Sequence, residues 1–291
     1  MNSGIKKRRM IESTFQLAAG LGPVRERQLW RAGVTRWRDW ATAPASVKLT
    51  DKVDRALRTA IDAAGAALAA GDVDGVAALV PTREQWRLYA AFGDDAAYLD
   101  IETSDDVVGY EGISCIGILD RDGPRLLLAG RDLQRFPELA RDWSMLVTFN
   151  GSSFDVPILR RAFPAWRPPS CHVDLRHVLR RLGHEGGLKA IERRLASLHL
   201  TRPEHLARLG GWDACWLYRR GREGDRAAMR LFAEYNLYDT VNLRTLMAWA
   251  YNEMIDVESA AAPALEATAR KVHVPERGDV LYDVAKIVLA L

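Results

Sequence analysis

The sequence predicts an α/β fold, in which a mixed five-stranded sheet is flanked by helices and preceded by a small all-helical N-terminal unit. Three observations predict it. Apolar runs between residues 98 and 129 are separated by turn residues, as in strands that meander. Between residues 145 and 175, apolar runs alternate with helical spacing, as in strands joined by helices. Residues Asp51–Ala70, in contrast, have helical spacing alone.

The N-terminal region is basic and rich in tryptophan. Residues 1–60, the basic front, contain thirteen Lys or Arg and five Asp or Glu. Their net charge is +8, which leaves −5 for the rest of a chain whose total is +3. Basic residues interleaved with aromatic ones are typical of nucleic-acid binding. Trp30, Trp37 and Trp40 can also form the core of a small helical unit, and we prefer this interpretation for most of them.

A glycine-rich turn lies within the basic front. Gly20-Leu21-Gly22-Pro23 separates two apolar stretches and resembles the turn of a helix–hairpin–helix module, which binds the DNA backbone without reading its sequence. Glycines permit a tight turn and close backbone approach, and the next helix offers free N–H groups to a phosphate. We therefore expect Gly20, Gly22 and Arg25 to contact nucleic acid. The same segment would also serve as a plain interhelical turn.

The first strand carries two carboxylates. Side chains alternate faces along a strand, so Tyr98, Asp100 and Glu102 share one face while Leu99 and Ile101 share the other. Two carboxylates at this spacing can hold one cation, and their hard oxygen atoms suit Mg²⁺ or Mn²⁺. Taken alone, the two acidic residues could equally be solvated strand residues.

The remaining elements are assigned from the same patterns. Further strands are predicted at Ile113–Leu119, Arg125–Ala129, Met145–Phe149 and His172–Leu175. Helices are predicted at Leu133–Trp143 and through most of Leu175–Ala250, and Val280–Leu291 is a terminal helix or strand.

Two later segments supply further carboxylates. Asn150-Gly151-Ser152-Ser153-Phe154-Asp155 follows a buried strand, and Pro157 can open a helix, so Asp155 is predicted at a strand-to-helix junction. Tyr235 and Asp239 are four residues apart in a helical pattern and share one face. Asp155 could simply cap a helix, and Tyr235 could be a core aromatic. Four inward carboxylates without matching bases, however, must hold cations, and paired metal ions commonly cut phosphodiesters.

Together the three segments resemble the motifs of the DEDD superfamily, the 3′–5′ exonucleases with a ribonuclease H-like fold. Asp100 and Glu102 match its Asp-x-Glu motif, Asp155 ends an Asn-x-x-x-Phe-Asp motif, and Tyr235 with Asp239 matches Tyr-x-x-x-Asp. A sister subclass has histidine five residues before the last aspartate. Glu234 stands there, so the chain resembles the tyrosine subclass.

The second half of the chain narrows the resemblance to the YprB-type ribonuclease H-like proteins. The similar segments are Gly186-Gly187-Leu188-Lys189 with Glu192, Trp212-Asp213-Ala214 and Asn236-Leu237-Tyr238-Asp239. The resemblance covers about residues 80 to 250. It implies a two-metal 3′–5′ exonuclease whose partner is nucleic acid, as single-stranded or 3′-ended DNA or RNA.

The resemblance also implies a role for each matched residue. Asp100, Glu102, Asp155 and Asp239 would hold two Mg²⁺ or Mn²⁺ ions, and Tyr235 would orient the attacking water. Asn150 and Phe154 would support the site, and Lys189 would contact a phosphate. One segment departs from the family. Thr103-Ser104-Asp105-Asp106 replaces a Thr-Thr-Gly loop that meets the terminal nucleotide, which adds two negative charges there.

Two other functions remain open at this point. A non-catalytic nucleic-acid-binding protein could use the same fold as a platform. An endonuclease or RNA-trimming enzyme could use the same metal site. Retention of all four carboxylates argues against the first, and the sequence does not separate DNA from RNA.

Composition limits the class of protein and its location. Hydrophobic residues make up 48% of the 291 residues and charged residues 27%, as in soluble globular proteins. No apolar run approaches the ~20 residues of a membrane span, and no signal-peptide core follows Lys6-Lys7-Arg8-Arg9. Three widely spaced cysteines suit a reducing cytoplasm. We divide the chain into a helical basic region (1–80), an exonuclease domain (81–252) and a C-terminal extension of unassigned role (253–291).

Overall fold

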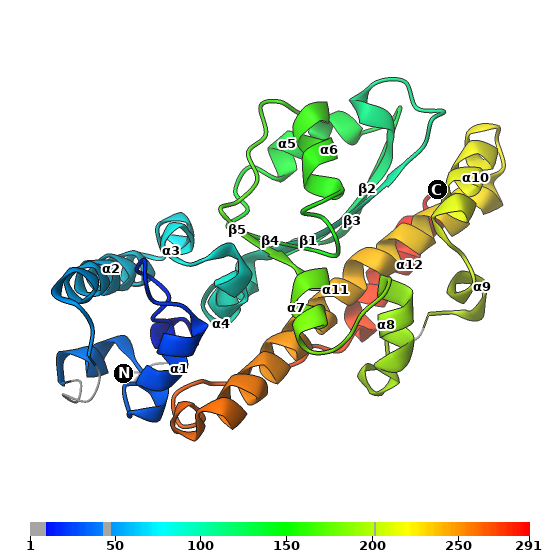
Figure 1. The fold of residues 1–291 in the computed structure, drawn as a ribbon. Helices are drawn as coiled ribbons and strands as arrows, with labels where there is room; N and C mark the ends of the chain where they lie inside the picture. The colour runs from blue at the N-terminus through cyan, green and yellow to red at the C-terminus, as the bar shows by residue number, and fades with distance from the viewer. Residues whose placement is uncertain (1–9, 43–47, 201) are drawn as a thin grey trace, which may run out of the picture. The chain divides into compact units, whose positions relative to one another are not determined.

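The computed structural model describes residues 10–42, 48–200 and 202–291, and the chain forms two compact units (Figure 1). One unit contains Met1–Asp94 with Ala248–His273, and the other contains Asp95–Met247 with Val274–Leu291. Among the described helices, none combines the length and apolarity that crossing a membrane requires. The predicted boundaries at residues 80 and 252 stay predictions.

The first unit is all-helical. Its elements are η1 (Met10–Ser13), α1 (Pro23–Arg31), η2 (Trp37–Thr42), α2 (Asp51–Ala70), α3 (Val73–Leu79), η3 (Thr82–Leu88), α4 (Tyr89–Phe92), η8 (Pro263–Leu265) and the last part of α11 (Arg226–Ala261), with η4 (Gly93–Asp95) following α4. Helix α2 has the predicted bounds. Trp30, Trp37 and Trp40 expose 8% or less, which confirms that they belong to a helical core.

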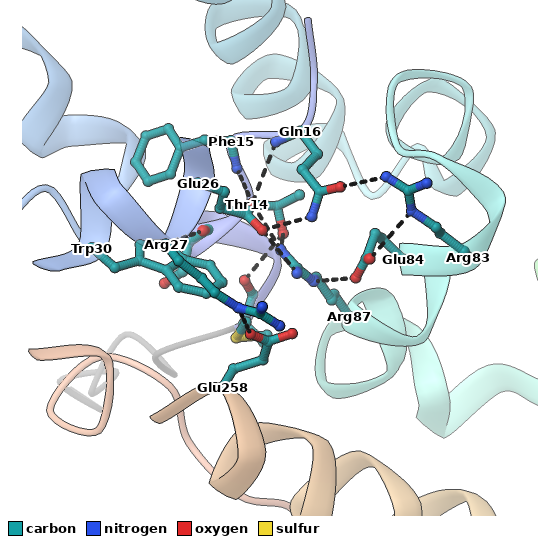
Figure 2. A network of polar contacts seen from close by, with 12 residues as sticks. Thr14, Phe15, Gln16, Glu26, Arg27, Trp30, Arg83, Glu84, Arg87 and Glu258 are labelled. Carbon is teal, nitrogen blue, oxygen red and sulfur yellow. Dashed lines mark hydrogen bonds and ion pairs between the residues drawn. The ribbon is translucent and has the colours of Figure 1, made fainter. Parts of the chain in front are cut away.

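A buried ionic network holds this unit together (Figure 2). The Arg87 guanidinium donates to both carboxylate oxygens of Glu26, at 2.9 Å each, and its Nε forms an ion pair with Glu84 at 2.9 Å. The guanidinium also contacts two indoles and lies 5.5 Å from the ring centroids of Trp30 and Trp86. A charge buried this deeply is tolerated only when it is paired, so truncating Glu26 or Arg87 would leave the other uncompensated.

The same network changes the expected structure around the glycine-rich turn. Glu26 accepts hydrogen bonds from the backbone N–H groups of Phe15 and Gln16, at 2.6 and 3.3 Å. These groups therefore bond to a side chain instead of to carbonyls one helical turn earlier. Over residues 10–22, the described part before α1, the only helical element is the four-residue η1. The apolar stretch upstream of Gly20 is a series of turns, not a helix.

The second unit contains the mixed five-stranded sheet, and it confirms the predicted fold class. Its strands are β1 (Ala96–Thr103), β2 (Ile113–Asp120), β3 (Gly123–Leu128), β4 (Met145–Thr148) and β5 (Cys171–Asp174), in the spatial order β3-β2-β1-β4-β5. Strands β1, β2 and β3 pair antiparallel, whereas β4 pairs in parallel with both β1 and β5.

Helices cover both faces of this sheet (Figure 1). The helices of this unit are α5 (Phe136–Leu139), α6 (Asp155–Ala162), α7 (Leu175–Arg181), α8 (Leu188–Arg194), α9 (Glu204–Ala207), α10 (Gly211–Arg222), the first part of α11 and α12 (Gly278–Leu289), with the short turns η5 (Tyr110–Gly112), η6 (Leu133–Arg135) and η7 (Ala196–Leu198). Leu99 and Ile101 of β1 pack in an apolar cluster with Phe136 of α5 and Leu159 of α6. The alternate residues of β1 therefore face α11.

The helix predicted at Leu133–Trp143 is much shorter in the structure. Only η6 and the single turn α5 form, and α5 ends at Leu139. The Trp143 indole packs edge-on against Phe136 at 5.9 Å and donates to Asp120 at 3.2 Å. A continuous helix would carry Trp143 past these two partners, so the chain turns after Leu139 instead.

Candidate metal centre

Three carboxylates converge on the α11 face of the sheet. Oxygen atoms of Asp100 and Glu102 from β1 and of Asp239 from α11 all lie within 4.8 Å of one another. Asp239 is 6% exposed, while Asp100 and Glu102 are half-buried. Side-chain alternation along β1 puts its two carboxylates on this face, as the sequence predicts.

Helix α11 reaches the sheet where the neighbouring strand has a glycine. Gly117 of β2 pairs with Asp100, and a Cβ at residue 117 would collide with side-chain oxygens of Asn236 and Thr240 on α11. Asn236 then donates to the Asp100 carboxylate at 2.8 Å and to the Asp100 carbonyl at 3.2 Å. Gly117, which lies in none of the motifs, and Asn236 thus set the distance between the carboxylates of β1 and α11.

Asp155 lies beside this group without belonging to the triplet. It is the first residue of α6, as predicted, and 3% exposed. Its Oδ1 accepts a hydrogen bond from the N–H of Ile101 at 3.0 Å. Strands β1 and β4 pair only as far as Tyr98, so this N–H lies beyond the end of the ladder and is available.

The carboxylates repel one another in a desolvated setting. Burial, reinforced by the charges of Asp239, Asp155 and Glu102, raises the pKa of Asp100 well above its usual value. Burial likewise raises the pKa of Glu102 to about 8 and of Asp155 to about 7. Carboxyl groups held this close keep protons unless another cation replaces them. An oxygen-only donor set of this charge fits a divalent metal ion.

Arg202 and Lys189 place bases beside the carboxylates, contrary to the expectation that no matching bases are present. Arg202 is 7% exposed, and its guanidinium forms an ion pair with Asp239 at 2.5 Å. It also donates twice to Glu192, at 2.7 Å each. Arg202 belongs to none of the motifs, so only the folded chain reveals its proximity to Asp239.

Tyr235 and Lys189 stack next to the same site. The Lys189 Nζ lies 3.7 Å from the centroid of the Tyr235 ring and donates to the Leu209 carbonyl at 2.7 Å. Burial lowers the pKa of Lys189. Burial and the charges of Asp239, Glu102 and Asp100 raise the pKa of Tyr235, which remains protonated. Its phenol is thus a hydrogen-bond donor and not a base.

The supporting residues predicted near Asp155 shape the turn in front of α6. Asn150 has a left-handed backbone, with φ of 65°, and its side chain accepts from Arg176. Its N–H donates to Asp174 at 2.7 Å, at the carboxyl end of β5. Phe154 is 41% exposed and precedes α6 directly. Asp174 was not among the predicted residues, although the meeting of parallel strand ends at one sheet edge could have indicated it.

The acidic loop after Glu102 is tied to α10. Arg219 Nε donates to the Asp106 carboxylate at 2.8 Å, and Arg222 donates to the Asp106 carbonyl at 2.8 Å. The Arg219 hydrogen bond lowers the pKa of Asp106. One of the two added negative charges is therefore neutralised within the fold, while Asp105 is exposed.

The predicted nucleic-acid contacts of the basic front lie in the other unit. Gly20 has φ of 91°, a conformation that favours glycine, and its carbonyl accepts from Arg25 at 3.3 Å. Gly22 is the N-cap of α1, which has no side-chain cap. Arg25, Arg31 and other residues line a surface hollow of about 650 Å³ beside α1.

The carboxylate site makes the stability of the metal-free protein depend on pH. The folded state keeps protons on Glu102 and Asp155 up to pH of about 8 and 7, whereas an unfolded chain loses them near pH ~4. The free energy of unfolding should therefore fall, by an amount on the order of a few kcal/mol, as the pH rises from the value at which the unfolded chain loses these protons, ~4, to the folded-state pKa of Glu102, about 8.

Thermal unfolding in EDTA at pH 5 and pH 8 measures this effect. Each kcal/mol lowers the midpoint by roughly 2–4 °C in a protein of this size. Added Mn²⁺ should remove most of the fall, because a bound cation replaces the protons. An unchanged or rising midpoint in EDTA would show that the carboxylates do not repel one another.

Comparison with known protein families identifies a match. A family model described as the RNase_H superfamily matches residues 97–251, which is more than half of the chain. The matched segment runs from β1 into α11 and includes all four carboxylates. No curated protein and no solved structure matches the chain.

Proposed function

This chain belongs to the RNase_H superfamily, and from that premise we propose that it is a two-metal-dependent 3′–5′ exonuclease of the DEDD type, tyrosine subclass, acting on DNA or RNA. The observation that supports this most is the convergence of Asp100, Glu102 and Asp239 within 4.8 Å, with Asp155 bonded to the residue after Asp100. The superfamily fold implies a nucleic-acid substrate and divalent cations.

Each residue would act through the contacts described above. Asp100, Glu102, Asp155 and Asp239 would hold two Mg²⁺ or Mn²⁺ ions. Such ions, when bound, supply water activation at neutral pH and stabilise the leaving oxygen. Tyr235 would orient the attacking water through its hydroxyl, since its raised pKa keeps the proton in place.

Lys189 would serve the substrate. Its ammonium lies on the Tyr235 ring and donates a hydrogen bond to the Leu209 carbonyl. An ammonium has three N–H donors, so it can also donate a hydrogen bond to a phosphate oxygen. We retain it as the proposed phosphate contact, and Asn150 and Phe154 as supports of the turn that carries Asp155.

The direct test is degradation of end-labelled DNA and RNA oligonucleotides with Mg²⁺, Mn²⁺ or EDTA. A 5′-labelled strand should shorten progressively from its 3′ end in either metal and stay intact in EDTA. A circular single strand, which has no 3′ end, is the matched control. Cutting of the circle would identify an endonuclease, and intact linear strands under all conditions would overturn the proposal.

The ion pair between Arg202 and Asp239 favours a second candidate, a nucleic-acid-binding protein that does not cut. In that protein the guanidinium would take the place of a cation at the last carboxylate. Calorimetry separates the two candidates. An exonuclease should bind Mn²⁺ and lose that binding in Asp239→Asn, whereas the non-catalytic protein should give no heat of Mn²⁺ binding.

We further propose that the basic front supplies much of the substrate affinity. It carries +8 while the rest of the chain carries −5, which repels a polyanion. Replacing Arg25 and Lys48 with glutamine should flatten the salt dependence of binding. Each lost phosphate contact lowers the log–log slope by roughly 0.7–0.9. Cutting at saturating substrate should be unchanged.

Point variants suit this experiment better than a deletion of residues 1–80, because Glu26 is the buried partner of Arg87. Gly22→Val adds a second test, since a Cβ there meets no atom within 4 Å yet would obstruct approach to the α1 N-terminus. The control is Arg121→Gln, which lies outside the basic front and whose side chain is 64% exposed. Salt slopes equal to that of the parent would assign the basic front to folding or protein docking instead.

A further inference from the structure

Helix α10 exposes two tryptophans on one face. Trp212 is 91% exposed and Trp216 is 54% exposed, whereas the other tryptophans in the described ranges are buried or half-buried. Residues four apart share a helix face and lie about 6 Å apart along its axis. Arg219 and Arg220 continue this face by one turn. The Arg220 guanidinium lies 5.2 Å from the centroid of the Trp216 ring.

The helix itself is firmly packed, so these indoles do not belong to a loose segment. Its opposite face buries Ala214, Leu217 and Tyr218, which expose 4% or less. The Tyr218 ring lies 5.2 Å from that of Phe232 on α11. Two indoles left in solvent on a packed helix contribute little hydrophobic stabilisation to the fold. Such exposure of large apolar side chains commonly marks an interaction surface.

The N-terminal half of α10 adjoins the carboxylate site. Within the helix, the Cys215 Sγ donates to the carbonyl of Thr103, the residue after Glu102, at 3.1 Å. Just before the helix, the Leu209 carbonyl holds Lys189, which lies on the Tyr235 ring. Helix α10 is therefore anchored directly to β1 next to Glu102, and the segment before it is anchored to Lys189, the proposed phosphate contact.

The charge of α10 suits a polyanion. The helix carries three arginines and one aspartate, a net charge of +2. Arg219 and Arg220 form surface ion pairs with Asp106 and Asp225, at 2.8 Å each, and these pairs leave both guanidinium groups exposed beside the indoles. Arginine beside exposed aromatic rings is the combination that single-stranded nucleic acid requires, because phosphates meet the charge and every base has a face that stacks. A paired duplex keeps its bases stacked inside and cannot use the rings in this way.

We propose that Trp212 and Trp216 form a stacking platform for unpaired bases of single-stranded nucleic acid whose 3′ end lies at the carboxylates. The platform sets the substrate class as single-stranded and positions the strand upstream of the cut. It rests on the proposed function for the position of the 3′ end. The stacking itself depends only on the two indoles and can be measured without any cutting.

The test measures binding of the full-length protein in EDTA. Fluorescein-labelled twelve-residue oligothymidine and oligouridine report affinity by anisotropy. Trp212→Ala and Trp216→Ala should each weaken binding about five- to hundredfold, the range that loss of one stacked base gives. Trp212→Phe, which keeps a ring, should recover most of the affinity, and Trp212→Leu, which keeps only an apolar chain, should not. Oligonucleotide should also protect the parent indoles from acrylamide quenching.

Tyr282→Ala is the matched control, because Tyr282 is 66% exposed on α12 and carries its own cation, Lys286, 4.1 Å from the ring centroid. Its loss should leave the affinity for the single strands unchanged. The affinity for a blunt hairpin duplex should be the same in the parent and in all variants. Equal single-strand affinity of the parent and both tryptophan variants overturns the platform. The platform is also overturned if self-association of the protein depends on Trp212 and its affinity for oligonucleotide does not.

The outcome separates the platform from the nuclease. Tryptophan-dependent binding without cutting in Mg²⁺ or Mn²⁺ would support the platform and overturn the exonuclease. If the parent cuts and both tryptophan variants bind and degrade single strands as the parent does, the exonuclease is supported and the platform is overturned.

Discussion

Asp100→Asn is expected to abolish removal of nucleotides from a 3′ end, with a rate loss of at least about 10³. Asp100 is the carboxylate at the centre of the group, since the charges of Asp239, Asp155 and Glu102 all raise its pKa. Asparagine keeps the size of the side chain and an oxygen that can still accept from Asn236. The initial rate on a 5′-labelled single strand in Mn²⁺ measures the effect.

The fold should survive this change. Removing one of several mutually repelling carboxylates should leave the thermal midpoint in EDTA at pH 8 equal or higher. Asp155→Asn should behave in the same way, because an amide oxygen can still accept the Ile101 N–H. Asp122→Asn is the control, as its side chain is 67% exposed on the turn between β2 and β3. A cutting rate for Asp100→Asn equal to that of the parent would end the assignment of this site.

Tyr235→Phe is expected to slow cutting by about 10²–10⁴, the usual scale for a positioned group that handles a proton. Only the hydroxyl is removed. The ring that packs beneath the Lys189 ammonium remains, so the local structure should persist. Rates at saturating substrate, measured beside Mn²⁺ affinity by calorimetry, report the two effects separately.

Metal affinity distinguishes orientation of water from support of the metal ligands. It should be nearly unchanged in Tyr235→Phe. Tyr238→Phe, on the same helix and beneath Arg277, is the control and should cut at the parent rate. If Mn²⁺ affinity falls as far as the rate does, Tyr235 supports the carboxylates and does not orient the water.

Local pattern was sufficient for the frame of the catalytic unit. Two-residue alternation put Asp100 and Glu102 on the face opposite Leu99 and Ile101, and the strand-to-helix junction put Asp155 at the start of α6. These features depend on neighbours in sequence, through the pleat of a strand and the fixed φ of proline. Local sequence pattern predicted the wrong structure where a side chain bonds to a partner that is distant in sequence. Trp143 bonds to Asp120, and the predicted helix at Leu133–Trp143 stops early.

The sequence by itself determined the sheet, the helix that carries Tyr235 and Asp239, and the residue types of the centre. Only the tertiary structure decided what surrounds them. Arg202 reaches Asp239 from a segment without a motif, and Asn236 reaches Asp100 across 136 positions. Gly117 lets α11 approach the sheet closely enough for the contact between Asn236 and Asp100. Such pairings arise when elements pack, and the periodicity of a single helix or strand does not record which distant side chain it will meet.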